Sequence, residues 1–336
     1  MMIIMNVDAT PEQVEAVVEK IGSYGFKAHL SQGEERTVIG VVGNEPITTR
    51  DQFLFMPGIA RIIPISRPYK LASREFIPQN TVFPAGNVPI GGEQVVIAAG
   101  CSLIEGRTQW LETAQAAKEA GAQLLYGGTF VPYSSPYSLH GLGETGLELL
   151  AEARQATGLP VMTEVVTPEQ VAPAARYADL LQINANNMQN YALLHAAGEC
   201  SRPVLIKRSN SGSIEELLMA AEYVLSHGNR SVIVCECGIR SFETHTHNTT
   251  DINAIPVLKA LTHLPVFLAP SESTGHWEYV APVALAAAAA GADGLLVAVH
   301  PNPEDALLDG NTMLKPERFA ALVAQVRAMA GGLGRG

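Results

Sequence analysis

From Gln94 onward, short apolar runs alternate with longer stretches whose apolar positions recur with helical spacing. This alternation is the sequence signal of parallel strands joined by crossover helices. Eight such runs occur, which is the strand number of a closed (β/α)8 TIM barrel. The runs are Val95–Ala99, Gln123–Tyr126, Val161–Val165, Leu180–Ala185, Val204–Lys207, Val232–Glu236, Val266–Ala269 and Leu295–Val299.

Residues 1–66 show a different order, namely strand, helix, strand, strand, helix, strand. Met2–Val7 and Thr37–Val42 are apolar runs typical of strands, and Ala60–Ile65 returns as the last one. Thr10 followed by Pro11 is a typical helix start, with a capping side chain before proline at the first helical position. The pattern predicts a small ferredoxin-like α+β domain.

Between these two patterns the chain is polar and interrupted by proline, as expected of a linker, and Val88–Gly92 favours a short hairpin that plugs the next domain. We therefore expect three parts. They are a ferredoxin-like domain (1–66), a linker with a hairpin (67–93) and a barrel domain (94–336).

The composition is that of an ordinary globular protein, with 47% hydrophobic and 16% charged residues in a chain of 336. The formal net charge of −11 disfavours binding to nucleic acid or to an anionic membrane, which needs clustered lysine and arginine. No apolar run reaches the roughly 20 residues of a membrane span. A cytoplasmic location follows as the expectation, and the four cysteines are expected to be reduced thiols.

Polar and reactive side chains gather where the predicted strands end. In a (β/α)8 barrel the carboxyl ends of the strands face the active site. Any one of these side chains could be ordinary packing, but eight ends that converge on one mouth predict a site for a small molecule. The residues at or just beyond these ends are Cys101, Tyr126, Glu164, Asn186, Lys207, Glu236, Pro270 and His300.

The segment Leu125–Ser138 reads L-Y-G-G-T-F-V-P-Y-S-S-P-Y-S. It resembles the motif R-G-G-A-F-K-P-R-T-S-P-Y-S-F-Q-G of the type I 3-deoxy-D-arabino-heptulosonate 7-phosphate (DAHP) synthases that carry a ferredoxin-like domain. Further blocks follow in the order of that family: Val161–Val165, Gln182–Asn190, Leu205–Arg208, Cys235–Glu243 and Gly291–Leu295. The resemblance covers nearly the whole chain. It implies a regulatory and assembly role for residues 1–66, and we expect a homotetramer.

The resemblance also implies a reaction in which phosphoenolpyruvate condenses with erythrose 4-phosphate at a divalent metal held by cysteine, histidine, glutamate and aspartate. Here the cysteine is Cys101 and the aspartate is Asp309, whereas Glu272 replaces the histidine and Ala298 replaces the glutamate. Cys101, Glu272 and Asp309 could still hold a metal if His300 or water filled the gap. A bound metal is nevertheless not expected, because a buried, hydrophobic Cys101 and an Asp309 that caps a loop explain the retained residues better.

The family's anion-binding cations are largely replaced. Tyr126, Val131, Tyr133, Asn186 and Cys237 stand at positions of arginine or lysine, while Lys207, Arg208 and Arg240 are retained. Each lost charged hydrogen bond is worth roughly 1.5–3 kcal/mol, so tight binding of two phosphorylated substrates is not expected. The candidate substrate-binding residues are Tyr126, Val131, Tyr133, Ser134, Ser135, Asn186, Arg208, Arg240 and His300.

Lys207 is the strongest catalytic candidate, because it lies at the end of a strand that has lost its cationic neighbours. A lowered pKa would let it form a Schiff base or act in proton transfer. Glu164 and Glu236 are candidate proton-transfer groups, although an ion pair of either with Lys207 would be a structural alternative. His245 and His247 on a nearby loop could add acid–base groups.

Three functions remain open at this point. The first is a divergent aldolase or transferase that acts on an atypical, less phosphorylated substrate, in a shikimate-related branch. The second is the conventional synthase. The third is a noncatalytic homologue that binds a metabolite. The uncharged side chains that stand at the family's cation positions favour the first function. The cofactor is unknown.

Overall fold

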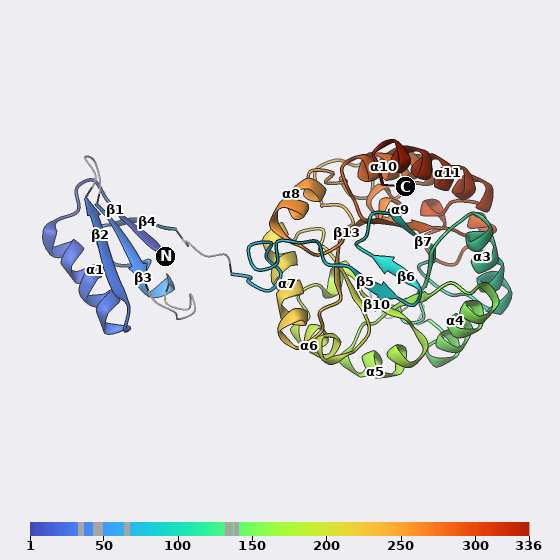
Figure 1. Cartoon of the computed structure of the whole chain (residues 1–336), viewed down its shortest axis with the longest axis horizontal. Coiled ribbons are helices and arrows are strands. Elements are labelled where there is room, and N and C mark those ends of the chain that lie inside the picture. The colour runs from blue at the N-terminus through green and yellow to red at the C-terminus, as the bar shows by residue number, and fades with distance from the viewer. Residues whose placement is uncertain (33–36, 43–49, 64–67, 132–136, 138–140, 336) are drawn as a thin grey trace. The chain divides into compact units, whose positions relative to one another are not determined.

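The computed structural model describes residues 1–32, 37–42, 50–63, 68–131, 137 and 141–335. The chain divides into two compact units, Met1–Pro68 and Tyr69–Gly336 (Figure 1). The expected boundary after residue 66 lies outside the described residues. Among those that are described, no helix is long and apolar enough to cross a lipid bilayer.

The first unit is an antiparallel sheet of four strands in the order β2-β3-β1-β4. Ile3 and Met5 of β1 are fully buried together with Val17 and Ile21 of α1, so the helix covers one face of the sheet. This arrangement confirms the predicted ferredoxin-like domain. Its elements are β1 (Met2–Met5), α1 (Pro11–Ser23), β2 (Lys27–Gln32), β3 (Thr37–Val42), α2 (Arg50–Phe53) and β4 (Ile59–Ile63).

The second unit is a closed barrel of eight parallel strands, as predicted. The strands are β7 (Val96–Cys101), β8 (Leu124–Gly127), β9 (Val161–Glu164), β10 (Leu180–Ile183), β11 (Val204–Lys207), β12 (Val232–Glu236), β13 (Val266–Leu268) and β14 (Gly294–Ala298). Each predicted run overlaps one of them, and β7, β8 and β14 extend beyond the predicted bounds by one or two residues.

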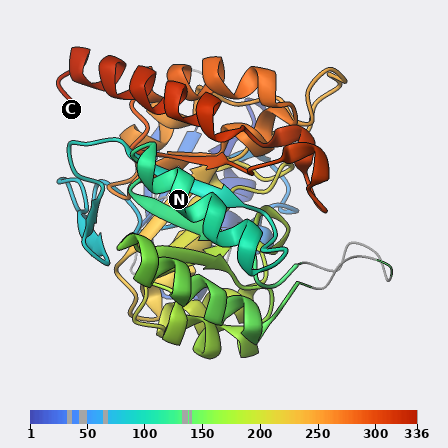
Figure 2. The ribbon, with the colours of Figure 1, turned by 90° about the vertical axis from the view of Figure 1, so that its right-hand side faces the viewer.

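Helices surround the strands of this unit (Figure 1), and α3 packs between α4 and α11 on its outside (Figure 2). The helices are α3 (Arg107–Glu119), α4 (Glu144–Thr157), α5 (Pro168–Tyr177), α6 (Tyr191–Glu199), α7 (Ile214–Ser226), α8 (Ala254–Leu261), α9 (Pro270–Thr274), α10 (Trp277–Ala289) and α11 (Pro316–Gly332). Short 3₁₀ turns at Ala185–Asn187, Pro303–Asp305 and Gly310–Thr312 follow β10 and β14.

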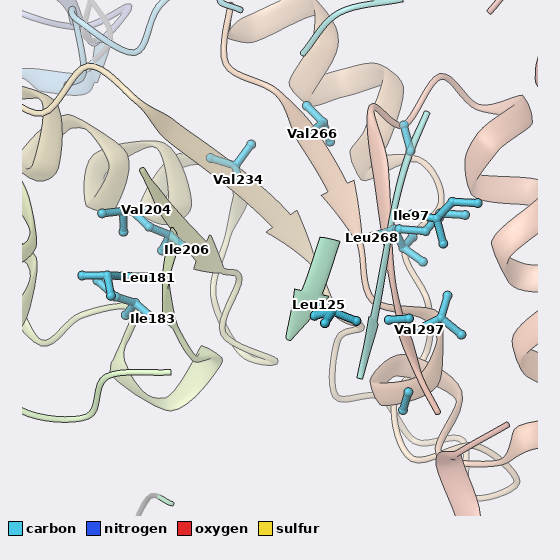
Figure 3. Packing of buried hydrophobic residues seen from close by; sticks show 14 of the residues in the cluster. Ile97, Leu125, Leu181, Ile183, Val204, Ile206, Val234, Val266, Leu268 and Val297 are labelled. Atoms are coloured by element: carbon cyan, nitrogen blue, oxygen red, sulfur yellow. The ribbon is translucent and has the colours of Figure 1, made fainter. Parts of the chain in front are cut away.

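Alternate residues of each barrel strand belong to two separate apolar clusters. Ile97, Leu181 and Val234 belong to the cluster that also contains the buried faces of the helices (Figure 3). Leu180 and Ile233, at neighbouring positions, belong to the cluster inside the barrel. Because side chains alternate along a strand, this division fixes which residue at each strand end can point into the barrel.

A hairpin closes the amino-terminal end of the barrel. It consists of β5 (Phe83–Ala85) and β6 (Val88–Ile90), whose buried residues join the interior cluster. Gly86 lies against Pro160, which precedes β9, and Gly91 lies against Pro265, which precedes β13. Both glycines have positive φ, 57° and 83°, which a residue with a side chain rarely adopts. With this end filled, the opposite end is left for a site.

We predict that Ile90→Ala lowers the free energy of unfolding of the barrel by about 2–5 kcal/mol, because it leaves a cavity in the plug. Ile90 is fully buried, whereas Val82 in the same segment is 54% exposed and serves as the control through Val82→Ala. Urea denaturation of both variants measures the difference. If Ile90→Ala lost no more free energy of unfolding than Val82→Ala, the hairpin would not contribute to the core.

Candidate active site

A cavity of about 850 Å³ lies at the carboxyl ends of the barrel strands. The floor of the cavity is formed by side chains at the carboxyl ends of several strands. Each of these side chains points inward and lies two positions after a residue of the interior cluster. Glu164 follows Met162 in this way, and Lys207 follows Leu205. Residues from segments after β10, β13 and β14 complete the lining, among them Asn186, Glu272 and Asp309.

Lys207 forms an ion pair across the cavity. Its Nζ lies 2.5 Å from Oε2 of Glu272, which is carried by α9, and the Lys207 side chain is only 9% exposed. Burial acts to lower the pKa of Lys207, but the nearby negative charges, Glu272 first among them, outweigh burial and raise this pKa above its ordinary value. The lowered pKa expected from the sequence is therefore wrong. Lys207 is a fixed positive charge, and its partner is Glu272 instead of Glu164 or Glu236.

Glu164 differs from the other carboxylates because it has almost no compensating partner. Burial raises its pKa to about 7, the nearby Lys207 charge opposes this rise, and Glu272 adds to it. Asn184 Nδ2 donates a long hydrogen bond of 3.4 Å to Oε2, while Oε1 has no hydrogen-bond partner in the part of the chain that the structure describes. A carboxyl group with such a pKa can take up or release a proton near neutral pH.

Glu236 and Arg208 are buried but lie outside the cavity lining. Arg208 Nη1 lies 2.9 Å from Glu236 Oε2 and 3.0 Å from Asp251 Oδ2, so these charges satisfy one another. The reason is the alternation of side chains along each strand: Arg208 follows the inward-facing Lys207, and Glu236 follows the inward-facing Cys235. Their position favours a structural role that ties the end of β11 to β12.

The other predicted residues are divided between the cavity and its surroundings. Tyr126, Val131 and Asn186 line the cavity. Arg240 is exposed and lies outside the lining, and His300 is buried with its Nε2 3.6 Å from Oε2 of Glu105. Tyr133, Ser134 and Ser135 lie outside the described residues. Of the two loop histidines, His247 reaches the cavity, whereas His245 is exposed and pairs with Glu243.

Gln182 and Asn184 are among the lining residues that were not candidates from the sequence. Gln182 lies at an inward-facing position of β10, in register with Glu164 of β9. A polar residue at such a position of an otherwise apolar strand is a signal that the alternation rule could have detected.

The residues that correspond to the family's metal ligands do not form a metal site. Cys101 is fully buried, receives a 3.6 Å hydrogen bond from Gln109 Nε2 of α3, and has a pKa raised to about 12 by burial, so it is a neutral thiol. Glu272 is occupied by Lys207, and Ala298 offers no ligand atom. All four positions, Cys101, Glu272, Ala298 and Asp309, line the cavity. Among the described residues no group of three or more histidine, cysteine, aspartate or glutamate side chains is placed to hold a metal.

Known proteins match both units of the chain. Residues 1–67 match the DAHP synthase ferredoxin-like domain, and residues 73–330 match the DAHP synthetase I family. A Phospho-2-dehydro-3-deoxyheptonate aldolase of Thermotoga maritima is 43% identical over 334 residues, which cover 99% of each chain. A 2-dehydro-3-deoxyphosphooctonate aldolase of Rhodopseudomonas palustris is 35% identical over 71% of this chain and 89% of its own.

Solved structures give the same result. The crystal structure of the DAHP synthase of Thermotoga maritima superposes with a TM-score of 0.93 at 42% identity, covering 99% of this chain and 97% of that one. A truncated form of the Thermotoga maritima synthase superposes with a TM-score of 0.74 at 44% identity and covers 79% of this chain and 98% of that one. With both domains matched in this order and over this length, the chain belongs to the DAHP synthetase I family.

Proposed function

We propose that this chain catalyses an aldol-type carbon–carbon bond reaction in the mouth of its barrel. The first candidate for this reaction is the condensation of phosphoenolpyruvate with erythrose 4-phosphate. Both the Thermotoga maritima and the Rhodopseudomonas palustris relatives are named aldolases, and the former matches this chain over its whole length. These names favour the conventional synthase over the atypical substrate that the sequence suggested.

The observation that carries the proposal is the presence, in one cavity, of a buried positive charge and a carboxyl group with a pKa of about 7. Aldol addition develops negative charge on the aldehyde oxygen, and this charge must be stabilised and then protonated. Lys207 can attract the developing charge, and Glu164 can supply or remove a proton. Since the described residues do not fit the family's metal site, no step is assigned to a metal.

Phosphate binding should be weak if the conventional reaction takes place here. Tyr126, Val131 and Asn186 line the cavity where the family resemblance places cations, and none of them carries a positive charge. A lost charged hydrogen bond of roughly 1.5–3 kcal/mol corresponds to a loss of affinity of about 10–100-fold. We therefore expect a high KM for both phosphorylated substrates.

A second candidate is the same type of reaction on a less phosphorylated substrate. One observation favours it: Lys207 is the one lysine or arginine among the described residues that line the cavity. The acidic side chains in this lining are Glu164, Glu272, Glu304 and Asp309. A cavity with this balance suits neutral, hydroxyl-bearing ligands better than phosphates. Assembly into a homotetramer stays a prediction from the sequence.

The assay of the purified full chain separates these functions. With phosphoenolpyruvate and erythrose 4-phosphate we expect a deoxy-keto acid product and released phosphate, with a KM above the usual enzyme range of about 1 μM–1 mM. Product formed with unphosphorylated erythrose, and not with erythrose 4-phosphate, would support the second candidate. The absence of product with either aldehyde, with and without added Mn²⁺, would contradict both and favour a noncatalytic homologue.

We predict that Lys207→Met lowers kcat/KM by about 10²–10³-fold, the usual cost of losing one group that stabilises transition-state charge. The matched control is Lys118→Met, on the exposed side of α3, which should keep full activity. Circular dichroism confirms that both variants fold. Undiminished activity in Lys207→Met would remove this lysine from the mechanism.

We predict that the purified protein holds well under one equivalent of Zn, Mn or Fe, and that EDTA leaves its turnover unchanged. The reason is that Ala298 offers no ligand atom and Glu272 is bound to Lys207. Elemental analysis and the same assay measure both quantities. A stoichiometric metal that is lost in Cys101→Ser would instead reveal a rebuilt site.

A further inference from the structure

Two oxygen atoms on the floor of the cavity are buried and have no hydrogen-bond partner among the described residues: Oε1 of Glu164 and Oε1 of Gln182. The two residues are 7% and 6% exposed. They are register partners on the neighbouring strands β9 and β10, and both side chains point inward. Neighbouring strands lie about 4.8 Å apart, so the two side chains are immediate neighbours.

Two adjacent acceptors without a donor are unfavourable, because each loses its hydrogen bonds to water on burial. A single proton removes the problem. Protonated glutamic acid gains an O–H donor, and the amide oxygen of glutamine can accept from it. Both unpartnered atoms are then satisfied at once.

We propose that Glu164 is held as a neutral carboxylic acid whose O–H donates to Oε1 of Gln182, and that Gln182 is the positioning residue that maintains this acid form. A hydrogen bond that is made only by the neutral form stabilises the neutral form. Gln182 thereby keeps a proton stored at the floor of the cavity.

The groups that face Glu164 agree with this assignment. Glu272 on α9 disfavours a second negative charge, in the same direction as burial, whereas Lys207 on β11 and the Asn184 amide favour the carboxylate. The opposing influences bring the pKa of Glu164 to about 7. The acid form is therefore available near neutral pH, and the carboxylate left after proton release has Lys207 nearby.

The catalytic consequence rests on the proposed function. When the C=C π electrons of phosphoenolpyruvate form the bond to the aldehyde carbon, the carbonyl π electrons move to the aldehyde oxygen. Water adds to the cationic carbon left behind, from which phosphate departs. The Glu164 proton passes to the aldehyde oxygen and yields the hydroxyl group of the product. Glu164 becomes a carboxylate and is reprotonated from water before the next turnover.

The stored proton is tested without any substrate, by NMR titration of the ligand-free full chain labelled at its glutamate carboxyl carbons. Glu164→Gln identifies the resonance of Glu164. We expect wild-type Glu164 to titrate near pH 7 and Gln182→Met to lower this pKa by about one unit, since one unit corresponds to a typical hydrogen bond. The matched control Gln109→Met alters a glutamine that is bonded to Cys101 and Thr113 behind the cavity, and it should leave the Glu164 pKa unchanged.

Two results would overturn the proposal. One is a wild-type Glu164 that titrates near its ordinary value of 4.5. The other is a rise of its pKa in Gln182→Met, which would mean that the amide nitrogen of Gln182 donates to the carboxylate.

A second measurement serves if Gln182→Met does not fold. A carboxyl group whose pKa is raised on folding stabilises the protein fully below its unfolded pKa, and this contribution is lost as pH rises through the folded pKa. The melting temperature of the wild type should therefore fall relative to that of Glu164→Gln between pH 4.5 and about 7. A parallel pH dependence of the two proteins would contradict the stored proton.

Activity, where present, tests only the catalytic step. The basic limb of the kcat/KM profile should lie near the Glu164 pKa and move to lower pH in Gln182→Met. An unmoved limb would exclude Glu164 as the proton donor. If the chain proves inactive, the proposed function fails while the titration still decides whether the proton is stored.

Discussion

The alternation of side chains along eight closed parallel strands is the constraint on which the site depends. It sends Lys207 into the cavity and the next residue, Arg208, into the layer between strands and helices. In β12 it sends Glu236 outward to Arg208 and leaves Ile233 and Cys235 at the inward positions. A one-residue shift would exchange these roles, so the chemistry of the cavity is set by register as much as by composition.

The two ends of the barrel have different roles: contacts at one end stabilise the fold, and the other end carries the polar groups of the cavity. At the amino-terminal end, Asp179 accepts a hydrogen bond from the backbone N–H of Val161, and Asp293 accepts one from that of Val266, at 3.0 and 2.8 Å. Each carboxylate thus connects the start of one strand with the residue that precedes the next strand, at the end of the barrel that the hairpin closes. The carboxyl end is left with polar groups that the fold does not fully satisfy, which is where barrel enzymes place their active sites.

The sequence was sufficient for the fold because apolar runs and helical spacing are local patterns, and each predicted strand is present. It also placed Tyr126, Glu164, Asn186 and Lys207 in the cavity, because strand ends converge in a barrel. It could not give the partner of Lys207. Glu272 lies 65 positions further along the chain, and only the folded distance of 2.5 Å shows that it outcompetes Glu164 and Glu236. The sign of the Lys207 pKa shift depends on that distance.

The pair of Lys207 and Glu272 explains how the family fold can coexist with a lining poor in cations. A substrate phosphate or carboxylate that approached Lys207 would have to share it with Glu272, whose side chain is only 34% exposed. Displacing this carboxylate would leave a partly buried charge without its partner, and such a loss is costly. Anionic substrates therefore face competition from a residue of the protein itself, whereas a neutral carbonyl can accept a hydrogen bond from Lys207 while the ion pair persists. Under the proposed function, Lys207 therefore stabilises charge that forms on the aldehyde oxygen during the reaction, while Glu272 remains its partner.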